Sequence, residues 1–420
     1  MSRTKSAEGW IRSRVPLPRD VVVLSLIAFC VAVGFGVLVP VLPVFARSFG
    51  VGNFEVGAVV SVFALMRLVS SSFCGRLIVV AGERVVLTVG IFIVAASSGL
   101  AGIAASYPQL LLLRGVGGIG SAMFSVSALT LLLNSVPVNF RGRAGGLFQG
   151  GFLIGGMAGP AVGGALAAIS ITAPFFFYAG TLAVAGTVGL LLLHRSPSRA
   201  PTPEDGVAIS FRQVLRDRRY QAACFTNLAQ GWTSFGVRSS LVPVLVVEML
   251  HRSTSWTGVA FACASVAQTI ALAPAGRFVD LVGRKPAIAG GCALSAVSIF
   301  AVPFVPNIGY LIVALCAYGV ASAFLGTAPA AAVGDAAGGR GGTAVAVFSM
   351  FGDAGAIVGP LVAGLLADRV SYPLAFGVGA ALLVGASLDA LRMPPGSPGK
   401  GSDHAGGNPG RTSGTDPETT

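Results

Sequence analysis

Twelve runs of about 20 consecutive apolar residues follow one another along this chain, and they limit its fold more than any other feature. A helix needs about 20 residues to cross the roughly 30 Å hydrocarbon core of a bilayer. Because the runs are continuously apolar, without a period of two, they indicate helices and exclude an outer-membrane barrel. We therefore expect an all-α integral membrane protein with twelve transmembrane helices. The expected spans are approximately residues 21–46, 55–79, 85–105, 108–132, 145–169, 173–193, 221–247, 257–280, 287–305, 308–333, 344–367 and 372–392.

The charged residues exclude a soluble protein and predict the orientation. Only 10% of the residues are charged, against about 25% in an ordinary soluble domain. Of the 28 Lys and Arg residues, 22 lie in segments on the side of the N-terminus, 3 lie in the opposite loops and 3 lie within spans. Because Lys and Arg stay on the cytoplasmic side, we expect a multi-pass protein of the plasma (inner) membrane with both termini in the cytoplasm. The net charge of +12 then reflects topology and contacts with membrane lipid, and nucleic acid is excluded as a partner.

Two similar halves, offset by about 200 residues, make up the spanning part. Val39-Pro40 recurs as Val242-Pro243, and Gly159-Pro160 recurs as Gly359-Pro360. Each half contains six expected spans, so both cross the membrane in the same direction, as in parallel transporter repeats. Two pseudo-symmetric six-helix bundles with a cavity between them follow. The expected organisation is a cytoplasmic segment (1–20), a first bundle (21–193), a cytoplasmic linker (194–220), a second bundle (221–392) and a disordered cytoplasmic tail (393–420).

Three motifs interrupt the apolar pattern. The loop expected after span 8 contains two glycines, an acid and a final Arg-Lys pair, and the matching loop after span 2 has Val79 in place of the acid. Glycines permit a tight connection, and the acid can pair with Arg or accept hydrogen bonds at a helix N-terminus. Span 4 contains Arg114, and span 5 contains small residues at a spacing of four, which favours close helix packing. The loop and span 5 residues are Gly75, Gly82 and Arg84; Gly276, Asp280, Gly283, Arg284 and Lys285; and Gly155, Gly159, Pro160 and Gly164.

These motifs resemble those of the major facilitator superfamily over roughly residues 20–392. The resemblance implies the two-bundle fold of that superfamily, a cytoplasmic latch that includes the two loops, and a role for Arg114 in substrate or proton handling. The span 5 motif is similar to one associated with drug:proton antiporters. Its repetition around Gly359-Pro360 leaves tight helix packing open as an alternative explanation.

The resemblance also suggests the side chains that contact a substrate. In members of the superfamily the cavity is lined mainly by spans 1, 4, 7 and 10. The candidate contacts in this chain are Phe35, Phe124, Asn227, Gln230, Trp232, Arg238 and Tyr318.

Two charged residues lie near the middle of the membrane. Arg67 is in span 2 and Asp353 is in span 11, at matching depths, and the spans face each other in the implied architecture. A charge pair would neutralise two otherwise costly ions. We therefore expect Arg67 and Asp353 to pair, and we take both, together with Arg114, as candidates for proton coupling.

The expected function is secondary active transport of a small molecule by alternating access, with proton-coupled efflux of a drug or metabolite as the leading hypothesis. A proton-independent or uptake facilitator of the same fold is the alternative, and a membrane receptor or enzyme is a remote one. We expect no enzymatic activity, no metal and no cofactor, because the sequence has no P-loop and no catalytic or metal-binding constellation. The expected energy source is the proton gradient, and the expected functional unit is the monomer.

Overall fold

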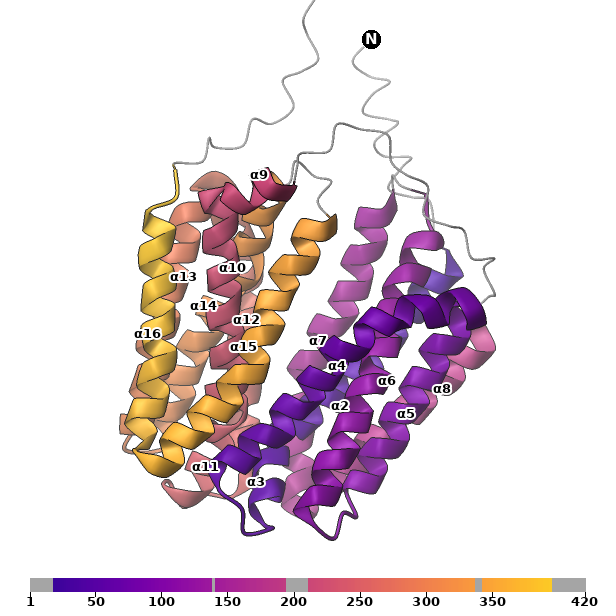
Figure 1. Cartoon of the computed structure of the whole chain (residues 1–420). Coiled ribbons are helices and arrows are strands. Elements are labelled where there is room, and N and C mark those ends of the chain that lie inside the picture. Colours follow the sequence, from indigo (N-terminus) through magenta and orange to yellow (C-terminus); the bar gives the residue numbers. More distant parts are fainter. Residues whose placement is uncertain (1–17, 138–139, 194–210, 337–341, 395–420) are drawn as a thin grey trace, which may run out of the picture.

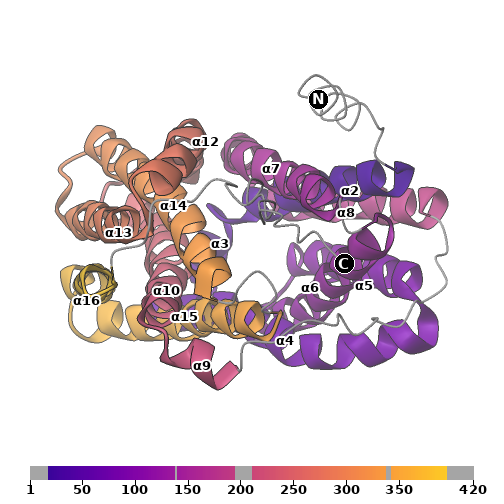
Figure 2. The same ribbon diagram turned by 90° about the horizontal axis from the view of Figure 1, so that it is seen from above.

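The computed structural model describes residues 18–137, 140–193, 211–336 and 342–394. Most of the expected N-terminal segment, linker and tail lies outside these residues. Two groups of helices stand side by side, and the first half of the chain forms one group (Figures 1 and 2). Its helices are α2 (Arg19–Leu38), α3 (Leu42–Arg47), α4 (Asn53–Ala81), α5 (Glu83–Ala101), α6 (Tyr107–Asn134), α7 (Arg141–Ile169) and α8 (Ala173–Leu192).

The second half repeats this arrangement. Its elements are α9 (Phe211–Arg216), α10 (Arg218–Gly231), the π-helix η2 (Trp232–Ser239), α11 (Leu241–Glu248), α12 (Thr254–Leu281), α13 (Arg284–Ala301), η3 (Val302–Phe304), α14 (Ile308–Ala336), α15 (Gly342–Arg369) and α16 (Tyr372–Leu391). Each half has its own hydrophobic core. One core is built around residues such as Leu24, Leu87 and Phe175, and the other around Phe261 and Phe376. The predicted all-α, two-bundle fold is confirmed.

Eleven helices in the described residues are long and apolar enough to cross a membrane. The remaining expected span, 221–247, consists of α10, η2 and α11 in direct succession. The first span is also interrupted, at Val39–Val41, between α2 and α3. Both interruptions lie beside a repeated proline, Pro40 or Pro243. Proline has no backbone N–H, so it removes a helical hydrogen bond at that position.

The span 5 glycines place the backbone of α7 against α2. A Cβ atom on Gly155 would lie 2.5 Å from the carbonyl oxygen of Phe29, and one on Gly159 would lie 2.6 Å from the Cα of Gly36. Gly164 faces the other half, where its Cβ would lie 2.9 Å from the Cα of Gly258 in α12. Small residues allow such close approach of helices. Helix packing, which the sequence left open, is therefore one role of this motif.

Two neighbouring glycines of α7 test this packing. Gly155→Ala forces α2 and α7 apart and should cost about 1–3 kcal/mol of stability, seen as a lower Tm of the detergent-solubilised protein. Gly156→Ala is the matched control, because a Cβ there meets nothing within 4 Å. It should raise stability by up to about 1 kcal/mol, since Ala is the better helix former. Equal melting temperatures for the two variants would contradict the packing role.

Candidate functional site

The two halves are joined at one end of the molecule, the end that carries α3 and α11 (Figure 1). There Arg47 of the first half pairs with Glu248 of the second, with 2.6 Å between Nε and Oε1. The Tyr372 hydroxyl donates to Glu248 over 3.3 Å and to the side-chain oxygen of Asn53 over 3.4 Å. The hydrogen bond with Glu248 raises the pKa of Arg47.

Asp368 adds a second connection at the same end. Its carboxylate, at the end of α15, accepts hydrogen bonds from the backbone N–H groups of Asn53 (2.9 Å) and Phe54 (2.8 Å) and from the Asn53 side-chain amide (2.8 Å). These donors lie at the N-terminus of α4, where a negative charge is favourable. A helix of one half is therefore capped by an acid of the other.

The predicted ion pair between Arg67 and Asp353 is confirmed. One guanidinium nitrogen of Arg67 in α4 lies 2.6 Å from Oδ1 of Asp353 in α15. One turn and a half closer to the joined end, the Ser61 hydroxyl donates to the carbonyl oxygen of Ile357 over 2.7 Å. The charge pair is partly exposed, with 37% of the Arg67 side chain and 25% of the Asp353 side chain accessible. It therefore connects the halves beside open space.

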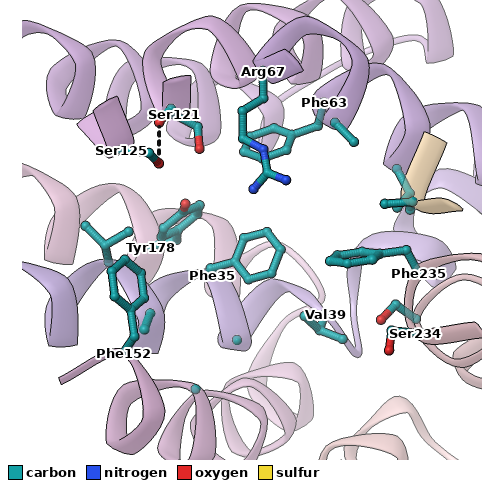
Figure 3. Close-up of a pocket in the computed structure, with 18 of the residues that line it drawn as sticks. Phe35, Val39, Phe63, Arg67, Ser121, Ser125, Phe152, Tyr178, Ser234 and Phe235 are labelled. Atoms are coloured by element: carbon teal, nitrogen blue, oxygen red, sulfur yellow. Dashed lines mark hydrogen bonds between the residues drawn. The ribbon is translucent and has the colours of Figure 1, made fainter. Parts of the chain in front are cut away.

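That space is a cavity of about 490 Å³, which is within the range of small-molecule sites. Figure 3 shows the Arg67 guanidinium pointing into it, with Phe35 and Phe235 also on its walls. Apart from the arginines, the walls are aromatic, aliphatic or hydroxyl-bearing. The lining residues are Val31, Ala32, Phe35, Gly36, Val39, Val60, Phe63, Ala64, Arg67, Arg114, Ser121, Phe124, Ser125, Phe152, Gly156, Pro160, Tyr178, Ser234, Phe235, Arg238, Ser239 and Ala356.

Two arginines of this cavity face aromatic rings. Arg114 of α6 is 6% exposed, and its guanidinium carbon lies 4.3 Å from the centre of the Phe63 ring. The Arg238 guanidinium, on η2, lies 5.1 Å from the centre of the Phe261 ring and 5.8 Å from that of Tyr318. The Nε atoms of both arginines are buried without a hydrogen-bond partner. Within the described ranges, neither arginine has a carboxylate partner.

Only part of the predicted contact set reaches the cavity. Phe35, Phe124 and Arg238 line it, as do Arg67 and Arg114. The other candidates are not part of its lining. Asn227 donates to the carbonyl oxygen of Phe348, Gln230 donates weakly to Ser322, Trp232 is 8% exposed, and the Tyr318 hydroxyl bonds with Ser234. A direct contact with substrate stays a prediction for the whole set.

The sequence analysis did not identify several wall residues. Ser234, Phe235 and Ser239 reach the cavity from η2, whose wider turn changes the register that an α-helix would give. Tyr178 of α8 reaches it past Gly34, where any side chain would collide with the tyrosine ring. The only tyrosine of that span was the available signal. The further aromatic and hydroxyl-bearing wall residues that were missed are Phe63, Ser121, Ser125 and Phe152.

The two loop motifs turn the chain at their second glycines. Gly82 and Gly283 have φ angles of 81° and 116°, which favour glycine. Gly75 and Gly276 do not belong to the connections as expected, because apolar residues after them continue α4 and α12 to residues 81 and 281. These first glycines lie within helices.

The basic residues of these motifs bind within their own halves. Arg84 donates to the carbonyl oxygen of Leu190 in α8, and Arg284 pairs with Asp335 of α14 at 2.9 Å. Asp280 is exposed, and the described residues give it no hydrogen bond or ion pair. The pseudo-symmetric architecture predicts that Asp280 lies beside Arg141 and Arg143 at the start of span 5. That contact is absent from this conformation, in which the halves are joined at the opposite end.

Comparison with known proteins agrees with this architecture. A sequence model of the Major Facilitator Superfamily matches residues 24–253 and 224–413. Multidrug resistance protein 1 of Bacillus subtilis is 25% identical over 366 residues, covering 86% of this chain and 92% of the relative. Quinolone resistance protein NorA of Staphylococcus aureus is 24% identical over 370 residues, covering 87% and 94%. A bacterial homolog of the human lysosomal transporter Spinster, solved in an inward-facing and occupied conformation, has a TM-score of 0.69 at 16% identity, with 88% and 95% covered.

Asp368→Asn should loosen the joined end, because it removes the charge that three amide donors face. For an exposed group, we expect a loss of about 1 kcal/mol, or roughly a fivefold shift towards conformations with this end open. Spin labels at Ser48 and His251, in a background without the native cysteines, would report the separation of the halves. Asp335→Asn, which breaks an ion pair within one half, is the control. An unchanged distance distribution in Asp368→Asn would show that the cap does not hold the halves together.

Proposed function

This chain belongs to the Major Facilitator Superfamily and is a multi-pass secondary transporter, and we propose that it exports a small drug-like or metabolite molecule in exchange for protons. The ion pair between Arg67 and Asp353 carries the proposal, because it links the two halves beside the cavity. The names of the relatives, which describe drug resistance, support the direction and the kind of substrate. The proposed location is the inner membrane, with both termini in the cytoplasm.

The distribution of charge supports an orientation for the conformation seen here. The halves are joined at the end that carries the loops with few Lys and Arg, and α9 and the C-terminal end of α16 lie at the other end (Figure 1). By the positive-inside rule that other end faces the cytoplasm. The cavity then belongs to a state that is closed to the outside and accessible from the cytoplasm, and Asp280 would form its latch in the opposite state.

Proton exchange follows from the separation of the charge pair. While the halves are joined beside it, the Asp353 carboxylate is paired with Arg67 at 2.6 Å. When they separate, an unpaired carboxylate at mid-membrane is costly, and taking up a proton removes that cost. Each cycle of the halves would then bind and release one proton, while the cavity carries the substrate.

Asp353→Asn should abolish pH-driven flux, because the side chain can no longer exchange a proton. The measurement is uptake of a fluorescent quinolone and a small panel of other compounds into proteoliposomes with an imposed pH gradient. We expect at least a tenfold loss of gradient-driven flux, with substrate counterflow retained. Asp389→Asn, an acid in α16 that does not line the cavity, is the control.

The charge swap, Arg67→Asp with Asp353→Arg, separates structure from coupling. It should partly restore the stability that single neutralisation lowers, but not the pH-driven flux. If Asp353→Asn retains its response to the gradient, the proton is carried elsewhere or the protein is a facilitator without proton coupling.

Asp280→Asn should slow turnover without preventing membrane insertion, because it weakens the proposed latch of the outward-open state. Initial rates in proteoliposomes, normalised to the amount of inserted protein, should fall about threefold to tenfold, as expected for a loss of roughly 1 kcal/mol. Arg277→Gln, an exposed change one turn earlier in α12, is the control. Wild-type turnover in Asp280→Asn would refute the latch assignment.

A further inference from the structure

The charges around the cavity do not cancel. Its lining includes Arg67, Arg114 and Arg238 but no Asp or Glu among the described residues. Asp353 neutralises Arg67 at 2.6 Å. The other two arginines retain their charges, so the cavity has a local charge of +2 in this conformation.

The two unpaired arginines are buried to different degrees, and Arg238 is partly exposed. Arg114 is 94% buried, and an isolated ion in a weakly polar interior loses much of its hydration. The aromatic rings beside the two guanidinium groups recover part of this loss through cation–π attraction. They do not provide hydrogen-bond acceptors, and the Nε atoms of both arginines are left without partners. An anion between the arginines would supply the missing charge and the missing acceptor.

The arginines come from opposite halves but share one cavity. Arg114 is on α6 of the first bundle and Arg238 is on η2 of the second. Both line the same cavity of about 490 Å³, so an anion held in it lies between charged walls of the two halves.

The rest of the wall suits a molecule with an apolar body. Six aromatic side chains line the cavity, and four serine hydroxyls can donate or accept hydrogen bonds. The aromatic residues are Phe35, Phe63, Phe124, Phe152, Tyr178 and Phe235, and the serines are Ser121, Ser125, Ser234 and Ser239.

We propose that the transported molecule is an amphipathic organic anion, with a carboxylate or similar group bound between Arg114 and Arg238 and an aromatic or aliphatic body against the phenylalanine wall. This substrate class rests on the proposed transport function. An organic cation is disfavoured, because both unpaired charges of the cavity would repel it. A neutral molecule would leave both arginines uncompensated.

Three probes with one shared ring system test the charge preference. They are 2-naphthoate, 2-naphthamide and 2-naphthylmethylammonium, which carry negative, zero and positive charge. Binding to the detergent-solubilised protein is measured by calorimetry and thermal shift at constant ionic strength, without any gradient. We expect naphthoate to bind at least tenfold more tightly than the other two.

Variants connect this preference to the two arginines. Arg238→Gln and Arg114→Gln should each reduce naphthoate affinity about tenfold and leave naphthamide binding unchanged. Arg238→Lys should keep part of the preference for naphthoate, because it keeps the positive charge. This variant also serves as the test if a neutral variant folds poorly. Arg252→Gln, the same change in an exposed loop, should have no effect.

The outcomes separate this inference from the proposed function. Equal binding of the three probes, no binding of naphthoate, or stabilisation by chloride with no further effect of naphthoate overturns the anion site. Selective naphthoate binding without pH-driven flux keeps the anion site and refutes proton-coupled export. Gradient-driven export of cations with no naphthoate binding keeps proton-coupled export and refutes the anion site.

Discussion

Every polar group that this chain places at membrane depth must find its partner inside the protein, because the hydrocarbon core of a bilayer offers none. The backbone satisfies this requirement by forming helices through both halves. The charged side chains near mid-membrane differ in whether they have such a partner. Arg67 and Asp353 satisfy each other at 2.6 Å, whereas Arg114 and Arg238 have only aromatic faces. The pair therefore ties the halves together, and the two remaining charges mark the place where a ligand is needed.

Small residues determine where the charge pair can form. The backbone of α4 at Gly57 contacts that of α15 at Pro360, and Gly364 of α15 packs in the same way against Asn53. A larger residue at Gly57 would move α4 away from α15 and separate Arg67 from Asp353. The charge pair between the halves thus depends on glycines that carry no charge themselves.

Some of this arrangement could be predicted because it depends on linear properties of the sequence. Hydropathy alone locates the spans, and counting residues from the membrane surfaces places Arg67 and Asp353 at one depth. The π-helix could not be predicted in this way. The sequence indicates from Pro243 that one helical hydrogen bond is missing. Whether the chain then bends or forms a wider π-turn depends on its contacts with the neighbouring helices. The Tyr318 hydroxyl, which bonds with Thr233 and Ser234, supports the widened turn. The residues that reach the cavity from this segment are Ser234, Phe235, Arg238 and Ser239, and the contacts expected at Gln230 and Trp232 are not part of its lining.

The two halves share one backbone arrangement, but their charged side chains at membrane depth are not repeated. Aligning Val39 with Val242 sets Arg238 against Phe35, and aligning Ser121 with Ser322 sets Arg114 against Leu315. By the same alignment of neighbouring motifs, Arg67 corresponds to Gln268 and Asp353 to Leu153. None of the four charged residues has a charged counterpart in the other half. The symmetric fold supplies two bundles that can rock against each other, and each charge is placed once. A ligand or proton held by these residues is therefore bound by both halves at a single site, and rearranging the halves changes the environment of that site.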